Sequence, residues 1–233
     1  MRAPSHNPPS DTPPSPELAA RTRLLDAGER LFAERGIEGT SIRDLAQAAG
    51  VNVAAVHYYF GGKEALYLEA LRRLFCASDL RPHFERLLET ARQRGTRAAA
   101  AEAFKDGISA FMGSLTDGLA AQPNRRTLMM MREMSQPTPA LDVIYKEDIE
   151  PKLSCLMELL TMLRPDLRGQ LDLKLTALSV VGQCLYYECQ RPILERMLGP
   201  KSLTPSFFRR AADHVAQFTL DALDRGRPLR RGS

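Results

Sequence analysis

Residues 52–59 combine small side chains with an amide, an imidazole and two phenol hydroxyls in one short stretch. On a helix, small side chains permit close approach to the DNA major groove, and their methyl groups can contact thymine methyls. Tyrosine hydroxyls and the free N–H groups of a helix N-terminus suit phosphate oxygens. The residues that we expect to face DNA are Asn52, Ala54, Ala55, His57, Tyr58 and Tyr59.

The stretch also has a plainer interpretation, in which Tyr58 and Tyr59 are buried aromatic residues and His57 is an ordinary surface residue. Polar and basic groups flank the stretch on both sides, at positions where helices are expected to begin. The flanking residues predicted to contact phosphate or a groove are Thr40, Ser41, Arg43 and Lys63.

Two short helices are expected to hold these groups in place. The first covers 42–49, begins after a capping hydroxyl and ends at Gly50, which tolerates a positive φ. The second covers 53–59, begins after Asn52 and is ended by the pair Gly61 and Gly62. The short turn that joins them is typical of a helix-turn-helix.

The same region carries runs that match a known family. They are Phe32-Ala-Glu-Arg-Gly36, Thr40-Ser-Ile-Arg-Asp-Leu-Ala46, Ala49-Gly-Val51, Val56-His-Tyr-Tyr-Phe60 and Lys63-Glu-Ala-Leu66. Over about Thr22 to Leu71 the chain resembles the DNA-binding domain of TetR/AcrR regulators, and most closely the CecR (YbiH)-like branch. Asn52 stands where the family more often has Ser or Thr, and His57-Tyr58-Tyr59 replaces the commoner Tyr-Tyr-His order.

The resemblance implies an all-α, TetR-like fold of about nine helices, with a three-helix head and a larger helical bundle. It implies a homodimer that binds a palindromic DNA operator as a repressor and releases it when a small apolar or amphipathic effector binds. Two-fold symmetry reading an inverted repeat is also the geometric expectation for paired helix-turn-helix heads.

Periodicity and turn residues divide the rest of the chain. A Pro-rich tail is expected over 1–16, the DNA-binding domain over 17–66, the effector-binding and dimerisation domain over 67–227, and a tail over 228–233. Helices are predicted from residue 17 to Gly36 and over 42–49, 53–59, 63–88, 96–121, 124–135, 140–163, 171–198 and 205–225, with Pro192 expected to kink or split the eighth.

The last two long helices offer the expected dimer surface. Gly182 and nearby alanines would allow close approach in a four-helix interface. The predicted interface residues are Leu178, Gly182, Leu185, Phe208, Val215 and Phe218. The alternative is that these side chains form the intramolecular core.

An effector pocket is predicted where methionines, which adapt to varied apolar ligands, gather beside aromatic and polar residues. Its candidate residues are Phe111, Met112, Met130, Arg132, Glu133, Gln183 and Tyr187. Core filling is the alternative for each methionine. Effector binding is expected to swing the predicted helix 63–88 and so change the spacing of the two recognition helices.

Composition favours a cytoplasmic protein that acts without a cofactor. The net charge is +4, the four cysteines show no CxxC spacing, and no apolar run approaches the length of a membrane span. We therefore expect no metal, no disulfide framework and no membrane partner. An enzyme is disfavoured because phosphate-loop, HExxH and GxSxG motifs are missing. A helical adaptor would leave the head unexplained, and an activator with the same head stays an alternative to a repressor.

Overall fold

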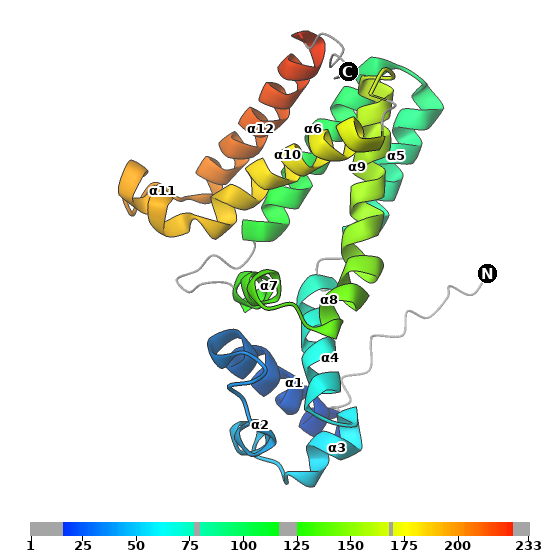
Figure 1. Ribbon diagram of the computed structural model, residues 1–233. Helices are drawn as coiled ribbons and strands as arrows, with labels where there is room; N and C mark the ends of the chain where they lie inside the picture. The colour runs from blue at the N-terminus through cyan, green and yellow to red at the C-terminus, as the bar shows by residue number, and fades with distance from the viewer. Residues whose placement is uncertain (1–15, 77–79, 117–124, 168–169, 226–233) are drawn as a thin grey trace, which may run out of the picture. The chain divides into compact units, whose positions relative to one another are not determined.

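The computed structural model describes residues 16–76, 80–116, 125–167 and 170–225 (Figure 1). Over these residues the chain is all helical, which confirms the predicted fold class. The helices are α1 (Pro16–Arg35), α2 (Ile42–Ala49), α3 (Ala54–Phe60), α4 (Lys63–Cys76), α5 (Arg81–Arg94), α6 (Arg97–Thr116), α7 (Arg125–Ser135), α8 (Pro139–Ile144), α9 (Glu150–Leu163), α10 (Gln170–Cys189), α11 (Arg191–Leu198) and α12 (Pro205–Arg225), with a π-helical turn η1 (Tyr145–Ile149) between α8 and α9.

The predicted number of about nine helices is too low, because prolines interrupt three of the long predicted segments. The uninterrupted helix over 63–88 is wrong: α4 ends at Cys76, and α5 begins beside Pro82. Pro192 separates α10 from α11, as expected. Pro151 has no N–H to donate to the previous turn, and η1 lies just before it.

The described residues form two compact units that divide after Ala70, four residues beyond the predicted boundary at Leu66. Helix α4 contributes residues to both units. In the first unit, α1 packs against α2, and its Phe32 ring meets Tyr67 of α4, around side chains with almost no exposure. Gly28 permits this approach, because a Cβ there would lie 3.3 Å from the Phe32 ring and 3.5 Å from Leu66. The core of this unit includes Leu24, Phe32, Leu45, Val56 and Leu66.

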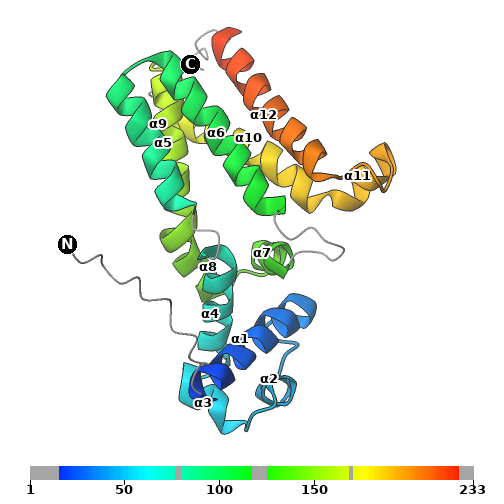
Figure 2. The ribbon, with the colours of Figure 1, turned by 180° about the vertical axis from the view of Figure 1, so that it is seen from behind.

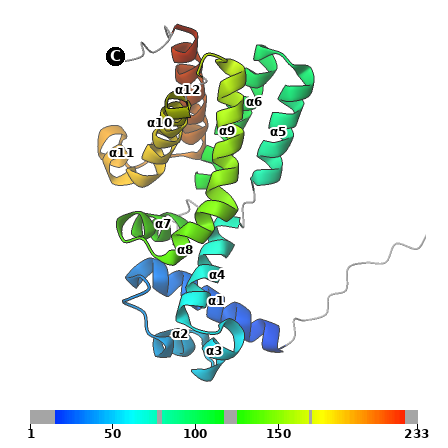
Figure 3. The ribbon, with the colours of Figure 1, turned by 45° about the vertical axis from the view of Figure 1, so that its right-hand side comes forward.

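The second unit is built around α6, which packs against α5, α9, α10 and α12. Helix α6 lies between α5 and α12 (Figure 2), and α9 runs along α5 and α6 (Figure 3). Gly107 allows α5 to come close, since a Cβ there would lie 3.2 Å from the Phe84 ring. Among the described residues, no helix is both long and apolar enough to cross a membrane.

Candidate nucleic-acid interface and ligand cavity

A capping box fixes the start of α2. The Ser41 hydroxyl accepts a hydrogen bond from the Asp44 backbone N–H at 3.1 Å, and the Ser41 N–H donates to the Asp44 carboxylate at 3.0 Å. The Ser41 hydroxyl also donates to that carboxylate at 2.6 Å. These hydrogen bonds hold the pKa of Asp44 below its usual value. The orphan N–H groups of this helix end are thus partly satisfied inside the protein.

The turn between α2 and α3 is locked by backbone hydrogen bonds. Gly50 has a φ of +63°, and its N–H donates to the Gln47 carbonyl at 3.2 Å. The Val51 N–H reaches back to the Ala46 carbonyl at 3.0 Å, which completes a left-handed helix cap. Arg23 of α1 donates from Nε to the Ala49 carbonyl at 2.9 Å. The angle between α2 and α3 is therefore held by the backbone and by α1.

Helix α3 buries one side and leaves the other open. Val56 is fully buried, whereas Tyr58 is 75% exposed. Tyr58 and Tyr59 meet edge to face with ring centroids 4.9 Å apart. Asn52 caps the turn by accepting from the Ala54 N–H at 2.9 Å. Asn52, Ala54, His57 and Tyr58 are exposed and Ala55 and Tyr59 are half-buried, so the structure brings the predicted DNA-facing residues onto one open face.

The flanking residues divide into accessible and internal groups. Arg43 is exposed on α2. Lys63 is half-buried, and its ammonium donates to the Ile37 carbonyl at 3.0 Å. Thr40 is only 1% exposed, and its hydroxyl donates to the Gly36 carbonyl at 2.8 Å. Thr40 is therefore corrected to an internal residue of the α1–α2 turn, where phosphate has no access to it.

The second unit contains a partly open cavity of about 720 Å³. Its wall is overwhelmingly apolar and is formed by α4 to α7, α9, α10 and the segment α8–η1. The aromatic and methionine side chains on the wall are Phe75, Phe84, Phe104, Phe111, Tyr145, Met130, Met131 and Met134. A concave, mostly carbon-lined space of this size is typical of a small-molecule site.

Charged groups on the cavity wall come from four helices and η1. Lys152 of α9 pairs with Asp148 of η1 at 2.6 Å, and both side chains are nearly buried. The Thr127 hydroxyl donates to the Glu188 carboxylate. Burial raises the pKa of Glu188 above its ordinary value. The guanidinium of Arg126 lies 5.1 Å from the centroid of the Phe75 ring.

Two of the predicted effector residues, Phe111 and Met130, line this cavity. Met112 is 1% exposed and belongs to the packed core, because its position on α6 points it toward α9, α10 and α12. Glu133 is 2% exposed and accepts hydrogen bonds from the Thr138 N–H and hydroxyl at 3.0–3.2 Å, so it organises the α7–α8 turn. Arg132 is exposed and lies outside the cavity wall.

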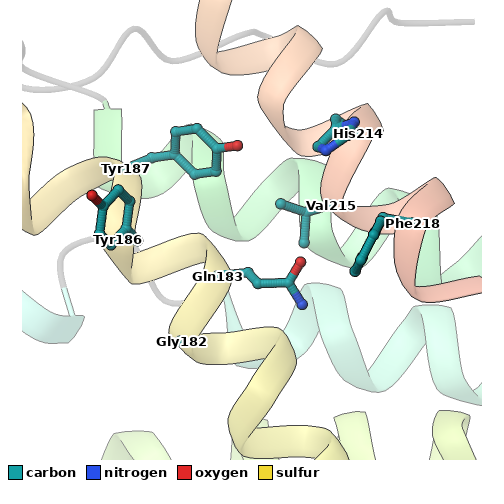
Figure 4. A pocket seen from close by; sticks show the side chains of 7 residues that line it. All are labelled: Gly182, Gln183, Tyr186, Tyr187, His214, Val215 and Phe218. Carbon is teal, nitrogen blue, oxygen red and sulfur yellow. The ribbon is translucent and has the colours of Figure 1, made fainter. Parts of the chain in front are cut away.

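A separate surface hollow of about 380 Å³ lies between α10 and α12, and it contains the remaining two predicted effector residues, Gln183 and Tyr187 (Figure 4). Both are therefore corrected: they line this hollow instead of the cavity. The hollow coincides with the predicted dimer surface. Its lining is Gly182, Gln183, Tyr186, Tyr187, His214, Val215 and Phe218.

An apolar surface stripe runs along α10 beside this hollow. Leu171, Leu175 and Leu178 are 68%, 51% and 58% exposed, and Phe218 of α12 is 58% exposed. A Cβ on Gly182 would meet no atom within 4 Å, so this position faces open space.

Three predicted dimer residues are not part of the exposed stripe. Phe208 and Val215 are 3% and 1% exposed and pack in the intramolecular core, which corrects their assignment. Val215 forms the floor of the hollow. Leu185 is half-buried and turns toward the cavity. The inward face of each helix was not distinguishable from its outward face by periodicity, since both carry apolar residues.

Sequence reasoning also missed much of the cavity wall. Phe75 and Phe84 fall within one predicted helix, 63–88, and no local feature of the sequence connects Arg126 or Thr127 with an effector site. The tertiary fold brings α4, α7 and α10 together around one cavity. Glu188, an acid near the end of α10, is a local signal in the sequence that points to an effector site, and it lies on the cavity wall.

A capped helix-turn-helix with an open recognition face in one unit, and a ligand-sized cavity in the other, are together typical of a transcriptional regulator. Comparison with known proteins agrees. The family model described as "Bacterial regulatory proteins, tetR family" matches residues 24–70, and the one described as "HTH-type transcriptional dual regulator CecR, C-terminal domain" matches residues 104–223. The chain belongs to the tetR family of bacterial regulators, with a C-terminal domain of the CecR type, which confirms the resemblance.

Curated relatives match part of their length. The chain is 31% identical over 144 residues to the HTH-type transcriptional dual regulator CecR of Shigella flexneri, which covers 60% of this chain and 63% of that protein. It is 43% identical over 65 residues to the HTH-type transcriptional repressor KstR2 of Rhodococcus jostii (strain RHA1), over 28% of this chain and 31% of that protein. The chain thus spans less than two thirds of these relatives.

Solved structures share the fold. HlyIIR, a hemolysin II transcriptional regulator, superposes with a TM-score of 0.59 at 22% identity, over 85% of this chain and 97% of that one. The transcriptional regulator FadR from Bacillus subtilis, solved in complex with stearoyl-CoA, superposes with a TM-score of 0.55 at 18% identity, over 88% and 98%.

Proposed function

We propose that this protein is a ligand-responsive transcriptional repressor that binds a palindromic operator as a homodimer and releases it when a small molecule occupies the cavity. The observation that carries the proposal is the open face of α3, with Tyr58 75% exposed above a backbone-locked turn. The small side chains of Ala54 and Ala55 would allow this face to enter the major groove. Arg43, Lys63 and the tyrosine hydroxyls would position it by phosphate contacts.

Dimerisation is supported by the apolar stripe of α10 and by Phe218 of α12. Large apolar side chains exposed side by side mark an interaction surface more often than a solvated one. A two-fold axis through this face would place the same stripe against itself, as isologous interfaces require. Gly182 would permit close helix approach there, because it presents no Cβ to the partner.

Helix α4 supplies a physical route from the cavity to the DNA-binding unit. Its Leu66 is fully buried in the core of the first unit, and its Phe75 lines the cavity in the second. Arg72, between them, holds Glu147 of η1 with two hydrogen bonds of 2.7 and 2.9 Å. Because Tyr145 and Asp148 of η1 also line the cavity, a ligand that shifts η1 or Phe75 would shift α4.

The test is a gel shift with the purified chain and the DNA upstream of its own gene. We expect a sequence-specific complex of one dimer with an inverted repeat. Scrambling either half-site should abolish it at the same salt concentration. A chain that binds both duplexes equally would overturn the proposal.

A second candidate is transcriptional activation, because one relative is named a dual regulator. A reporter gene under the bound promoter, measured with and without the chain, separates the two. Higher expression in the presence of the chain would replace repression by activation.

A further inference from the structure

The two basic residues on the cavity wall are already stabilised by the protein. Lys152 and Asp148 form a 2.6 Å ion pair with side-chain exposures of 11% and 7%. Breaking such a buried pair leaves an uncompensated charge in a place that water hardly reaches. Arg126 lies against the Phe75 ring and donates from Nη1 to the Ser114 carbonyl at 3.4 Å. A negatively charged ligand therefore gains little from either residue.

Glu188 is less fully compensated. Its carboxylate is half-buried on α10 at the cavity wall and accepts a hydrogen bond from the Thr127 hydroxyl. A carboxylate offers about four acceptor positions, so this hydrogen bond satisfies a fraction of them. Arg191, the next basic residue along the chain, is held by Glu195 at 3.1 Å, and the charges of both Arg191 and Arg126 favour the ionised form of Glu188. Burial outweighs these favourable charges and raises the pKa of Glu188, so a further cation beside the carboxylate would stabilise its ionised form.

Aromatic rings surround the rest of the space. Phe84, Phe104, Phe111 and Tyr145 all line the cavity, and aromatic faces attract cations when water is excluded. At about 30 Å³ per water-sized group, the 720 Å³ cavity holds roughly two dozen non-hydrogen atoms. The wall thus combines an apolar volume, aromatic faces, the half-buried carboxylate of Glu188 and the exposed carboxylate of Asp142.

We infer that the cavity binds a lipophilic amine: an apolar body of up to roughly two dozen non-hydrogen atoms with one protonated nitrogen, for which Glu188 is the counter-ion. This inference rests on the proposed function, because that proposal makes the cavity the effector site. It adds the charge class of the effector and the residue that selects it.

Three probes with the same alkyl chain and different headgroups test the inference. Dodecylamine, dodecanol and dodecanoate are titrated into the full chain by calorimetry at pH 7.5 and below their micelle concentrations. At this pH the amine is protonated and the carboxylic acid is ionised. We expect the amine to bind at least about tenfold more tightly than the alcohol, and dodecanoate to bind most weakly.

Glu188→Gln keeps the shape of the side chain and its ability to accept from Thr127. In this variant the amine should lose about tenfold in affinity, to the level of the alcohol, while the alcohol is unaffected. Asp213→Asn is the matched control: it removes an exposed acid of α12, outside the cavity wall, and should leave all three affinities unchanged.

Equal or tighter binding of dodecanoate, binding of none of the probes, or an amine preference that survives in Glu188→Gln would each overturn the inference. A gel shift with operator DNA separates this result from the proposed function. If dodecanoate releases the DNA, the repressor role stands and the amine assignment is wrong. If no specific DNA complex forms at all, the proposed function is wrong, whichever probe binds.

Discussion

Replacing Tyr58 tests whether α3 is the surface that binds DNA. The side chain is 75% exposed, and its ring packs edge to face against Tyr59, so its removal should leave the fold intact. Substitutions at exposed positions usually change the free energy of unfolding by no more than about 0.5 kcal/mol. A loss of operator affinity in a protein of unchanged thermal stability would therefore report on a missing DNA contact.

The expected loss follows from two copies of the site in each complex. Tyr58→Phe removes one hydroxyl per subunit, worth about 1 kcal/mol of hydrogen bonding, or about 2 kcal/mol per dimer. At about 1.4 kcal/mol per factor of ten, operator affinity should fall about 30-fold. Tyr58→Ala also removes the ring; at about 1.5 kcal/mol per subunit, or about 3 kcal/mol per dimer, the loss should exceed about 100-fold.

The assay is fluorescence anisotropy with a labelled operator duplex at fixed salt, together with thermal unfolding of each variant. Gln47→Ala, on an exposed position of α2, serves as a control for surface substitution near the interface. Wild-type affinity in Tyr58→Ala would refute the assignment of this face to DNA. A large loss of thermal stability would show instead that the ring is part of the core.

Four further outcomes are expected. The slope of log affinity against log salt should be about −3.6 or steeper, since Arg43 and Lys63 of two subunits give four cationic contacts; a flat profile in anisotropy titrations contradicts these contacts. Gly39→Ala should destabilise the fold by about 2 kcal/mol or more, because its Cβ would lie 2.4 Å from the Arg35 carbonyl oxygen; thermal melting measures the loss, and an unchanged midpoint contradicts it. Leu178→Arg should yield monomers in light scattering, and a persisting dimer would place the interface elsewhere. The pKa of Asp44 is lower in the folded chain than its unfolded value of about 3.8, so the ionised carboxylate stabilises the fold at pH values above 3.8, and this contribution is lost as the pH falls through the folded pKa. The urea unfolding midpoints of the wild type and Asp44→Asn should therefore converge at low pH, and a difference that stays constant with pH contradicts the capping box.

The head could be predicted residue by residue because its signals are local. Capping residues, turn glycines and a short apolar period each act within a few positions, and α2 and the Gly50 turn lie where the sequence placed them. Thr40 is the exception. Its hydroxyl donates a hydrogen bond to the Gly36 carbonyl instead of facing solvent. Whether this hydroxyl is buried or reaches a phosphate depends on how closely α1 and α2 pack.

The body was predictable as helices but not as a site. Helices α10 and α12 carry apolar residues on several faces, so periodicity could not tell Phe208, which is buried, from Phe218, which is exposed. Likewise, Met112 and Met130 are alike in sequence, yet one fills the core and the other lines the cavity. Whether a given side chain fills the core, lines the cavity or faces solvent depends on contacts between helices that are far apart in the chain. Local sequence patterns do not carry that information.

The position of α4 imposes a thermodynamic condition on the proposed regulation. Leu66 and Phe75 lie on one helix, so a ligand that alters the packing of Phe75 acts on an element that the DNA-binding unit also needs. Linkage then requires reciprocity: if a ligand lowers operator affinity by a given factor, operator DNA must lower ligand affinity by the same factor. A coupling of about 1–3 kcal/mol corresponds to about 5–150-fold in each direction. A ligand that binds the free chain and its DNA complex equally well would leave α4 without a role in release.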